Sequence, residues 1–362
     1  MPVPEKMRDY LRTMVEVEAS DLHLRAGSRP IFRVGGKLRL GKNFPELTAS
    51  DTSAAVLELI NDDQKKRYEE SKEIDFSFSF QGLARFRVNI FQQRGAANIV
   101  MRMVPDRIKS IKELNLPGAI KKIASSNRGI VLVTGTTGSG KSTTLAAIID
   151  YINRNFSRHI ITVEDPIEYL HEDIKSIISQ RELGVDTLSY KDALKHVVRQ
   201  DPDVILVGEL RDIDTTATAL SAAQTGHLVL TTTHTINASQ TLTRIVDMFP
   251  PHYQRQIKQS LSETLTAVIS QRLLPRTDRE GMIPAVEVLT ATSLVRTMIE
   301  EDSLGGINEQ IEKGSYYGMQ SFNQSLEQLY REGKISIEDA QQASTNPEDL
   351  MLRIRGIKSE ME

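Results

Sequence analysis

The chain of 362 residues contains no cysteine, which excludes disulfide bonds and any metal site built on thiolates. Its seven histidines show no paired spacing of the zinc-finger type. No apolar run approaches the roughly 18 residues needed to cross a bilayer, and the first residues lack the apolar core of a signal peptide. We therefore expect a cytoplasmic protein that meets a membrane only through a partner.

A strong net charge is also missing, because 45 basic and 48 acidic residues leave a formal charge of −3. This balance gives no global attraction to nucleic acid, and no long basic or aromatic track compensates for it. With 39% hydrophobic residues, the chain is an ordinary globular protein long enough for two domains, each with its own core. We expect no nucleic-acid partner.

One stretch has the spacing of a phosphate-binding loop, and it reads Gly135, Thr136, Thr137, Gly138, Ser139, Gly140, Lys141 and Ser142. A short apolar run at 129–134 precedes it and is typical of a buried strand. Leucine and isoleucine recur at helical spacing over 143–153 behind it. The motif requires this strand, loop and helix, so the sequence predicts binding of a nucleoside triphosphate.

The chemistry of this loop follows from its residue types. Its glycines let the backbone wrap a polyphosphate, and the helix N-terminus adds partial positive charge. Lys141 is expected to neutralise the β- and γ-phosphates, and the Ser142 hydroxyl to bind Mg²⁺. The eight loop residues and Thr143 are the candidate ATP-binding residues. The competing interpretation is a glycine-rich turn without a ligand.

Residues 1–104 are predicted to form an α+β unit with a small antiparallel sheet. We expect helices over 7–18 and 51–68, the second capped by Thr48 or Ser50. Strands are expected over 21–25, 30–34, 37–40, 75–80, 85–90 and 96–104. Arg85 and Arg87 share the wetted face of this sheet. They either lie in solvent or reach a triphosphate bound elsewhere, because guanidinium groups suit phosphate oxygens.

Residues 105–117 are predicted to be a linker or an entry helix, bounded by prolines. Beyond them, apolar strands at 159–163, 204–207 and 228–232 alternate with helical segments such as 190–199 and 214–223. This alternation predicts a mainly parallel sheet covered on both faces. Beyond residue 282 the chain is mostly helical, most clearly over 292–300 and 321–331.

Polar residues follow the predicted strands where a parallel sheet places its ligands. Glu209 follows 204–207 in a Walker B-like arrangement, and Glu164 follows 159–163. We expect Glu209 on the metal and water side, with Mg²⁺ held through water, and Glu164 as general base or its partner, with exchanged roles left open. The competing interpretation for each is a capping or surface carboxylate. His234 could sense the γ-phosphate, although a histidine at a strand end, like His227, is commonly structural.

Several motifs occur in order along nearly the whole chain. They are residues 19–24 (Ala-Ser-Asp-Leu-His-Leu), the phosphate-binding loop, 163–168 (Val-Glu-Asp-Pro-Ile-Glu), 207–212 (Val-Gly-Glu-Leu-Arg-Asp), 225–229 and 233–235 around the two histidines, 270–274 (Ser-Gln-Arg-Leu-Leu) and 318–322 (Gly-Met-Gln-Ser-Phe). With these motifs the chain resembles the secretion ATPase superfamily and, within it, the twitching-motility (PilT-like) ATPases of type IV pili.

The resemblance implies a PAS-like N-terminal domain at 1–104, a linker at 105–117, a RecA-like ATPase domain at 118–290 and a helical C-terminal region at 291–362. It further implies a homohexameric ring in which Arg87, Arg94 and Arg102 reach the triphosphate and the two domains swing about the linker. The implied task is ATP-driven pilus retraction. The implied partners are an inner-membrane platform protein at its cytoplasmic face, the pilus assembly machinery and a paralogous retraction ATPase.

Two features favour the retraction branch of this family. Extension and type II secretion relatives usually carry a four-cysteine zinc element and extra N-terminal domains, and this chain has no cysteine and its first motif starts at Ala19. One segment departs from the retraction pattern, because 294–299 keeps Arg296 but has Thr297 in place of asparagine. An accessory or regulatory paralogue, or an extension or type II secretion ATPase, therefore stays open as an alternative.

Overall fold

The computed structural model describes residues 5–80, 83–104 and 107–356, and the chain divides into two compact units. One unit holds Met1–Arg107 with Glu168–Leu170, and the other holds Ile108–Ile167 with His171–Glu362. The predicted linker begins at residues 105 and 106, which lie outside the described part of the chain.

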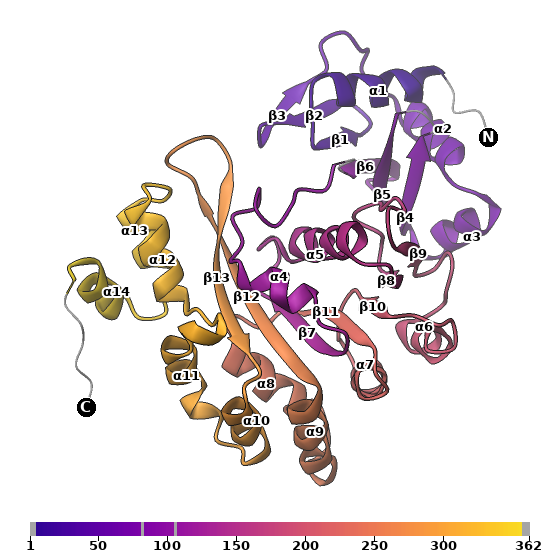
Figure 1. Cartoon of the computed structure of the whole chain (residues 1–362). Coiled ribbons are helices and arrows are strands. Elements are labelled where there is room, and N and C mark those ends of the chain that lie inside the picture. The colour runs from indigo at the N-terminus through magenta and orange to yellow at the C-terminus, as the bar shows by residue number, and fades with distance from the viewer. Residues whose placement is uncertain (1–4, 81–82, 105–106, 357–362) are drawn as a thin grey trace. The chain divides into compact units, whose positions relative to one another are not determined.

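The N-terminal unit is built on a six-stranded sheet of order β3-β2-β1-β6-β5-β4, in which all neighbouring strands are antiparallel (Figure 1). Its strands are β1 (Asp21–Leu24), β2 (Ile31–Val34), β3 (Lys37–Leu40), β4 (Glu73–Phe80), β5 (Ala84–Gln93) and β6 (Ala96–Val104). Its helices are α1 (Glu5–Glu16), α2 (Ala49–Leu59) and α3 (Asp62–Ser71). The predicted α+β unit with an antiparallel sheet is confirmed.

The period-2 pattern of the strands explains which face is buried. Phe86, Val88 and Ile90 of β5 are fully buried and pack with apolar residues of α1, α2 and α3 in one core. The single helix predicted over 51–68 is wrong. Asn61 forms a capping box with Gln64 and starts a second helix there, whereas the expected cap Thr48 is confirmed at the start of α2.

The second unit contains a seven-stranded sheet of order β13-β12-β7-β11-β10-β8-β9, parallel except for β13. Its strands are β7 (Gly129–Thr134), β8 (His159–Glu164), β9 (Ile177–Glu182), β10 (Val204–Val207), β11 (Leu228–Thr233), β12 (Leu265–Pro275) and β13 (Met282–Thr290). The predicted parallel sheet is confirmed, and so are its four predicted strands, which are β7, β8, β10 and β11. Strands β9, β12 and β13 were not predicted. The expectation of a mostly helical chain beyond residue 282 is wrong for β13, and the helices begin at Ser293.

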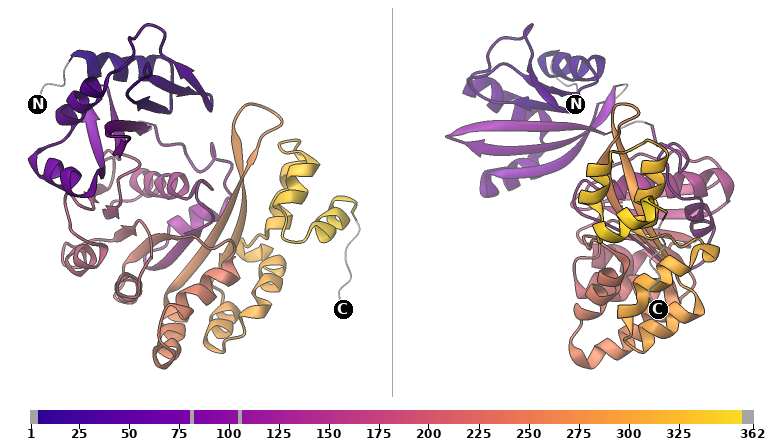
Figure 2. Two further views of the ribbon diagram at one scale, coloured as in Figure 1. Left: turned by 180° about the vertical axis from the view of Figure 1, so that it is seen from behind. Right: turned by 90° about the vertical axis from the view of Figure 1, so that its left-hand side faces the viewer.

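Helices cover both faces of this sheet, as the continuous apolar runs of its strands require (Figures 1 and 2). On one face α4 (Ala119–Ala124) and α5 (Lys141–Asn155) pack against the strands. The other face is covered by α6 (Tyr190–Val197), α7 (Ile213–Gln224), α8 (Ala238–Asp247), α9 (Pro251–Thr264), α10 (Ser293–Glu300) and α11 (Ile307–Lys313).

The C-terminal helices form a smaller core of their own. Residues of α12 (Phe322–Arg331), α13 (Ile337–Ala343) and α14 (Pro347–Ile354) pack with Leu274 of β12 and Ile283 of β13. The helices predicted over 292–300 and 321–331 are confirmed as α10 and α12. Within the described residues, no helix is long and apolar enough to cross a membrane.

Candidate nucleotide-binding site

The predicted phosphate-binding loop joins the buried strand β7 to helix α5. Gly135, Gly138 and Gly140 adopt positive φ angles of 147°, 80° and 91°. A side chain is also sterically excluded at Gly135, where a Cβ atom would lie 2.4 Å from Ser139 Oγ and 2.6 Å from the carbonyl oxygen of Gln271. Only glycine relieves both constraints, so these positions let the chain turn tightly into the helix.

The first turn of α5 is prepared for an anion. Its N-cap residue is Gly140, which has no side chain that could cap the first backbone N–H groups of the helix. These groups can therefore bind an anion. Lys141 Nζ folds over the loop and donates to the carbonyl oxygens of Gly135 at 2.8 Å and Thr136 at 3.1 Å. The ammonium group and the N–H groups therefore face the same small volume, which suits phosphate oxygens.

A cavity of about 970 Å³ borders this loop and gives a nucleotide room beside it. Ser139, Gly140, Thr143 and Gln271 belong to its lining. Among the described residues, the buried atoms Ser139 Oγ and Gln271 Oε1 have no hydrogen-bond partner. Buried polar atoms without partners are costly, so these groups fit a polar ligand next to the loop.

The sheet register explains why the predicted catalytic residues meet. Strand β10 lies between β8 and β11, and Val207 pairs with Val163 on one side and Thr231 on the other. Because the strands are parallel, their carboxyl ends form one edge. Glu209 therefore lies between the neighbouring strand ends that carry Glu164 and His234, and the phosphate-binding loop follows β7 on the far side of β11.

Glu209 is held by two cationic or cationisable side chains. Arg211 Nε donates to its Oε2 at 2.7 Å, and His234 Nε2 lies 3.0 Å from its Oε1. The hydrogen bond that Arg211 donates to Glu209 raises the pKa of Arg211 further, so the guanidinium stays charged. The carboxylate is mostly buried, with 16% of its side chain exposed. This position can orient a water molecule or a hydrated cation at the sheet edge.

Glu164 ends β8 and is half-buried. Its Oε1 accepts hydrogen bonds from Thr162 Oγ1 at 2.7 Å and Gln180 Nε2 at 3.3 Å. Thr162 belongs to the same strand and Gln180 to the edge strand β9, so neighbouring strands fix the carboxylate. Both predicted carboxylates are thus held at the same edge of the sheet.

Tyr190 at the start of α6 was not predicted from the sequence. A Cβ atom on Gly208 would lie 2.5 Å from its Oη, so glycine before Glu209 lets the phenol approach the catalytic edge. Burial raises the pKa of Tyr190, and the charge of Asp165 adds to this effect. The phenol therefore stays protonated and can donate a hydrogen bond beside the carboxylates. No spacing in the sequence marks it, because it follows a different strand.

Glu287 on β13 was also missed. It is buried, and its Oε1 accepts from the backbone N–H of Ala238 at 2.8 Å and from Ser270 Oγ at 3.2 Å. Burial raises the pKa of Glu287. Since Ala238 begins α8 shortly after His234, this carboxyl ties the loop behind His234 to strands β12 and β13.

His227 lies away from this edge. It precedes β11, and its Nδ1 lies 2.9 Å from the carbonyl oxygen of Ala222, so it is a structural residue at the opposite edge.

The arginines Arg87, Arg94 and Arg102 all lie in the N-terminal unit. Arg87 and Arg102 are exposed cross-strand neighbours on β5 and β6. Arg102 Nε also donates to Asp21 Oδ1 at 2.8 Å. Arg94 is exposed in the tight turn between the two strands, with φ 53°. Two like charges side by side are unfavourable, so Asp21 compensates one of them and Arg87 faces solvent.

The model of the family described as type II/IV secretion system protein matches residues 1–357. The chain is 47% identical to a twitching motility protein of Neisseria gonorrhoeae over 321 residues, which are 89% of this chain and 86% of that protein. It is 44% identical to the type IV pilus retraction ATPase PilT of Pseudomonas aeruginosa over 331 residues, which are 91% and 96% of the two chains.

A solved structure agrees with these relatives. The crystal structure of the pilus retraction motor PilT with bound ADP is 44% identical and superposes with a TM-score of 0.88, covering 95% of this chain and 98% of that one. The expected architecture, a PAS-like domain followed by a RecA-like ATPase domain with a helical C-terminal region, is confirmed by this likeness. The resemblance to PilT-like ATPases is confirmed as well.

Proposed function

The chain belongs to the type II/IV secretion system protein family, and from this premise we propose that it is the ATP-hydrolysing motor of type IV pilus retraction. The observation that carries the proposal is the single sheet edge at which the phosphate-binding loop, Glu164, Glu209 and His234 meet. Phosphoryl transfer needs charge neutralisation and a positioned water more than a covalent nucleophile, and this edge supplies both.

In this proposal the loop from Gly135 to Ser142 holds the β- and γ-phosphates through backbone N–H groups, and Lys141 leaves its carbonyl partners to neutralise them. Mg²⁺, when bound, screens the phosphate charge and orders the oxygens for in-line attack. The Ser142 hydroxyl and, through water, Glu209 would hold it. Among the described residues, no three acidic or histidine side chains form a metal cluster, and Mg²⁺ is commonly bound by few protein groups together with phosphates.

Glu209 and Glu164 have different roles in the proposed reaction. Glu209, whose two oxygens meet Arg211 and His234, is held rigidly enough to orient the attacking water or the hydrated cation. Glu164 accepts the proton directly or assists Glu209, with its orientation set by Thr162 and Gln180. His234 follows the end of β11 and contacts the carboxylate of Glu209. Through this contact it senses the charge of the γ-phosphate.

The assembly is proposed from the family. Six copies form a ring at the cytoplasmic face of the inner membrane, where the ring meets a platform protein of the pilus machinery and a paralogous retraction ATPase. Arg87, Arg94 and Arg102 complete the triphosphate site, and residues 105–117 are the hinge. Exposed guanidinium groups of this kind suit phosphate oxygens. Replacing Arg87 by alanine should lower ATP turnover while the unfolding temperature stays the same.

A second candidate is an accessory or regulatory paralogue of the retraction motor. It is favoured by Thr297 on α10, which stands where retraction relatives have asparagine and is exposed, with its hydroxyl donating to the carbonyl of Ser293. An accessory protein would bind ATP and depend on a partner for turnover. ATP hydrolysis by the purified protein without a partner would exclude the accessory role.

The test combines biochemistry with pilus assays. We expect Mg²⁺-dependent ATP turnover from a species of hexameric mass in light scattering, and loss of turnover in Lys141→Ala. In cells that lack their own copy, the parent chain should restore pilus retraction and Lys141→Ala should not. A protein that turns over ATP but restores no retraction would leave the ATPase assignment standing and refute the retraction role.

A further inference from the structure

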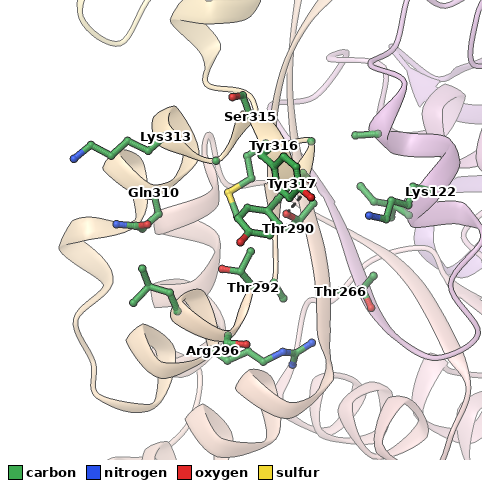
Figure 3. A pocket seen from close by; sticks show the side chains of 18 of the residues that line it. Lys122, Thr266, Thr290, Thr292, Arg296, Gln310, Lys313, Ser315, Tyr316 and Tyr317 are labelled. Carbon is green, nitrogen blue, oxygen red and sulfur yellow. Dashed lines mark hydrogen bonds between the residues drawn. The ribbon is translucent and has the colours of Figure 1, made fainter.

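A second cavity, of about 1110 Å³, lies in the ATPase unit and is lined by no residue of the phosphate-binding loop. Its walls come from α4, from the segment that joins β13 to α10, and from the segment between α11 and α12 (Figure 3). Two motifs without a role in ATP chemistry meet there, because residues 294–299 and 318–322 both contribute to the lining.

The charge of this cavity has one sign. Its charged lining residues are Lys122, Arg296 and Lys313, and none of the described residues that line it is acidic. Lys313 pairs with Glu309 one turn earlier on α11, but both side chains are more than 60% exposed, so solvent screens the pair. Lys122 is exposed on α4, on the opposite wall in Figure 3. The cavity thus presents cations from two sides.

Arg296 supplies a third cation from below. It is half-buried, and its guanidinium donates to the backbone carbonyls of Ser262 and Leu265 at the end of α9. Burial lowers the pKa of Arg296, but an arginine side chain stays protonated in proteins. Carbonyl dipoles offset only part of a full charge, so the cavity floor favours an anionic occupant.

The rim of the cavity is apolar and aromatic. Tyr316 is 92% exposed, Tyr317 55% and Leu294 52%. The two tyrosine rings meet edge to face with centroids 5.3 Å apart, and Figure 3 shows them between Lys313 on one side and Lys122 on the other. Tyrosine and arginine are enriched where proteins bind other proteins, and large exposed apolar side chains that cluster commonly mark such surfaces.

The shape of the wall is also fixed. Gly318 has φ 79°, and a Cβ atom there would lie 2.9 Å from the Cβ of Ala119 on α4. Thr290 Oγ1 donates to the carbonyl of Tyr317 at 3.3 Å and ties the aromatic segment to the end of β13. The cavity is therefore built by close packing and side-chain anchoring.

We propose that this cavity is the docking site for an acidic segment of a protein partner. Carboxylates of the segment contact Lys122 and Lys313 on the two walls, with Arg296 beneath them, while apolar side chains of the segment pack on Tyr316, Tyr317 and Leu294. The aromatic rim favours a protein segment over a free anion, because it offers area that only apolar groups can bury. This site is separate from the ATP chemistry and does not depend on it.

The test uses a short fluorescein-labelled peptide of alternating glutamate and leucine and the full-length protein, with binding followed by fluorescence anisotropy at low salt. We expect saturable binding that the glutamine version of the peptide does not show. Charge reversal in Lys122→Glu with Lys313→Glu should weaken binding by about tenfold or more. Tyr316→Ala should weaken it as well. The matched control for Lys122→Glu is Lys121→Glu, which makes the same charge reversal on the same helix but outside the lining of the cavity.

Each alternative occupant has its own signature. Equal weakening by Lys121→Glu, or equal binding of the glutamine peptide, would overturn the proposal. A change of assembly mass in light scattering for the Lys122 and Lys313 variant would assign the surface to contacts between copies of this chain. Loss of binding to phosphatidylglycerol vesicles without loss of peptide binding would assign it to lipid, and either result refutes a protein segment. Unchanged ATP turnover and unfolding temperature in the variants exclude misfolding as the cause.

Discussion

Replacing Glu209 by glutamine should abolish most ATP turnover while leaving the fold and nucleotide binding intact. Glutamine keeps the shape of the side chain and an acceptor for Arg211 Nε, which now donates at 2.7 Å, but it removes the negative charge between Arg211 and His234. In the proposed mechanism this charge orients and activates the attacking water molecule. The substitution therefore tests the role of the charge in ATP hydrolysis while the fold and nucleotide binding stay unchanged.

The expected magnitudes differ strongly for the two properties. Activation of the attacking water by a positioned carboxylate contributes about 10²–10⁴-fold, which corresponds to roughly 3–5 kcal/mol of activation free energy. The free energy of unfolding should fall by much less, because Arg211 is 63% exposed and solvent screens its ion pair with Glu209. Such pairs contribute below about 1 kcal/mol, which shifts the unfolding temperature of a domain of this size by less than about 4 °C.

The assay is steady-state ATP turnover together with thermal unfolding and binding of a fluorescent ATP analogue. Asp214→Asn is the matched control, because it makes the same chemical change at the exposed ion pair with Lys191, whose atoms lie 2.6 Å apart. The control should keep full turnover. Turnover of Glu209→Gln above about a tenth of the parent value would refute the assignment, because the loss of rate would be smaller than activation of the attacking water supplies.

Three further predictions rest on single contacts. Gly208→Ala should destabilise the protein by about 1–3 kcal/mol by overpacking, because its Cβ would lie 2.5 Å from Tyr190 Oη; Tyr190→Phe should restore stability in thermal unfolding, and no rescue would contradict the contact. Lys141→Ala should weaken binding of the ATP analogue by at least about tenfold without lowering the unfolding temperature; unchanged affinity would contradict its phosphate role. Burial raises the pKa of Asp21, but the hydrogen bonds from Ser20 and Arg102 and the charges of Arg102 and Arg33 outweigh it, so that this pKa is lowered. Asp21→Asn should therefore cost about 1 kcal/mol at neutral pH, a difference that persists above about pH 4 and shrinks as the pH falls further; a difference that grows on acidification would contradict the sign.

The sequence predicts elements whose pattern is local. The buried strands at 204–207 and 228–232 appear because an apolar run ends at polar residues, and α10 and α12 because of their helical spacing. Strand β12 begins at Leu265 directly after α9 ends at Thr264, so no glycine or proline marks the change. Strand β9 is an edge strand with polar residues over most of its length, which weakens its apolar signal. The start of α3 was detectable, because Asn61 and Gln64 form a capping box.

In the candidate site, too, residues marked by a local sequence pattern could be predicted and residues placed by packing could not. The phosphate-binding loop, Glu164 and Glu209 could be found because each directly follows its own strand, and position at a strand end is readable from the sequence. Tyr190 could not be found, since its place beside Gly208 depends on packing between α6 and the end of β10. The pairing of Arg102 with Asp21 joins residues 81 positions apart, and no local pattern reports such a contact.

The order of the central strands has a consequence for how a motor of this kind can work. Strands β7, β11, β10 and β8 are neighbours joined by continuous hydrogen-bonded ladders, and the predicted catalytic side chains follow their ends. Amide protons in such buried strands exchange with solvent only when the whole unit opens. We therefore expect the spacing of the strand ends to change little during hydrolysis, and movement to arise in segments outside the sheet.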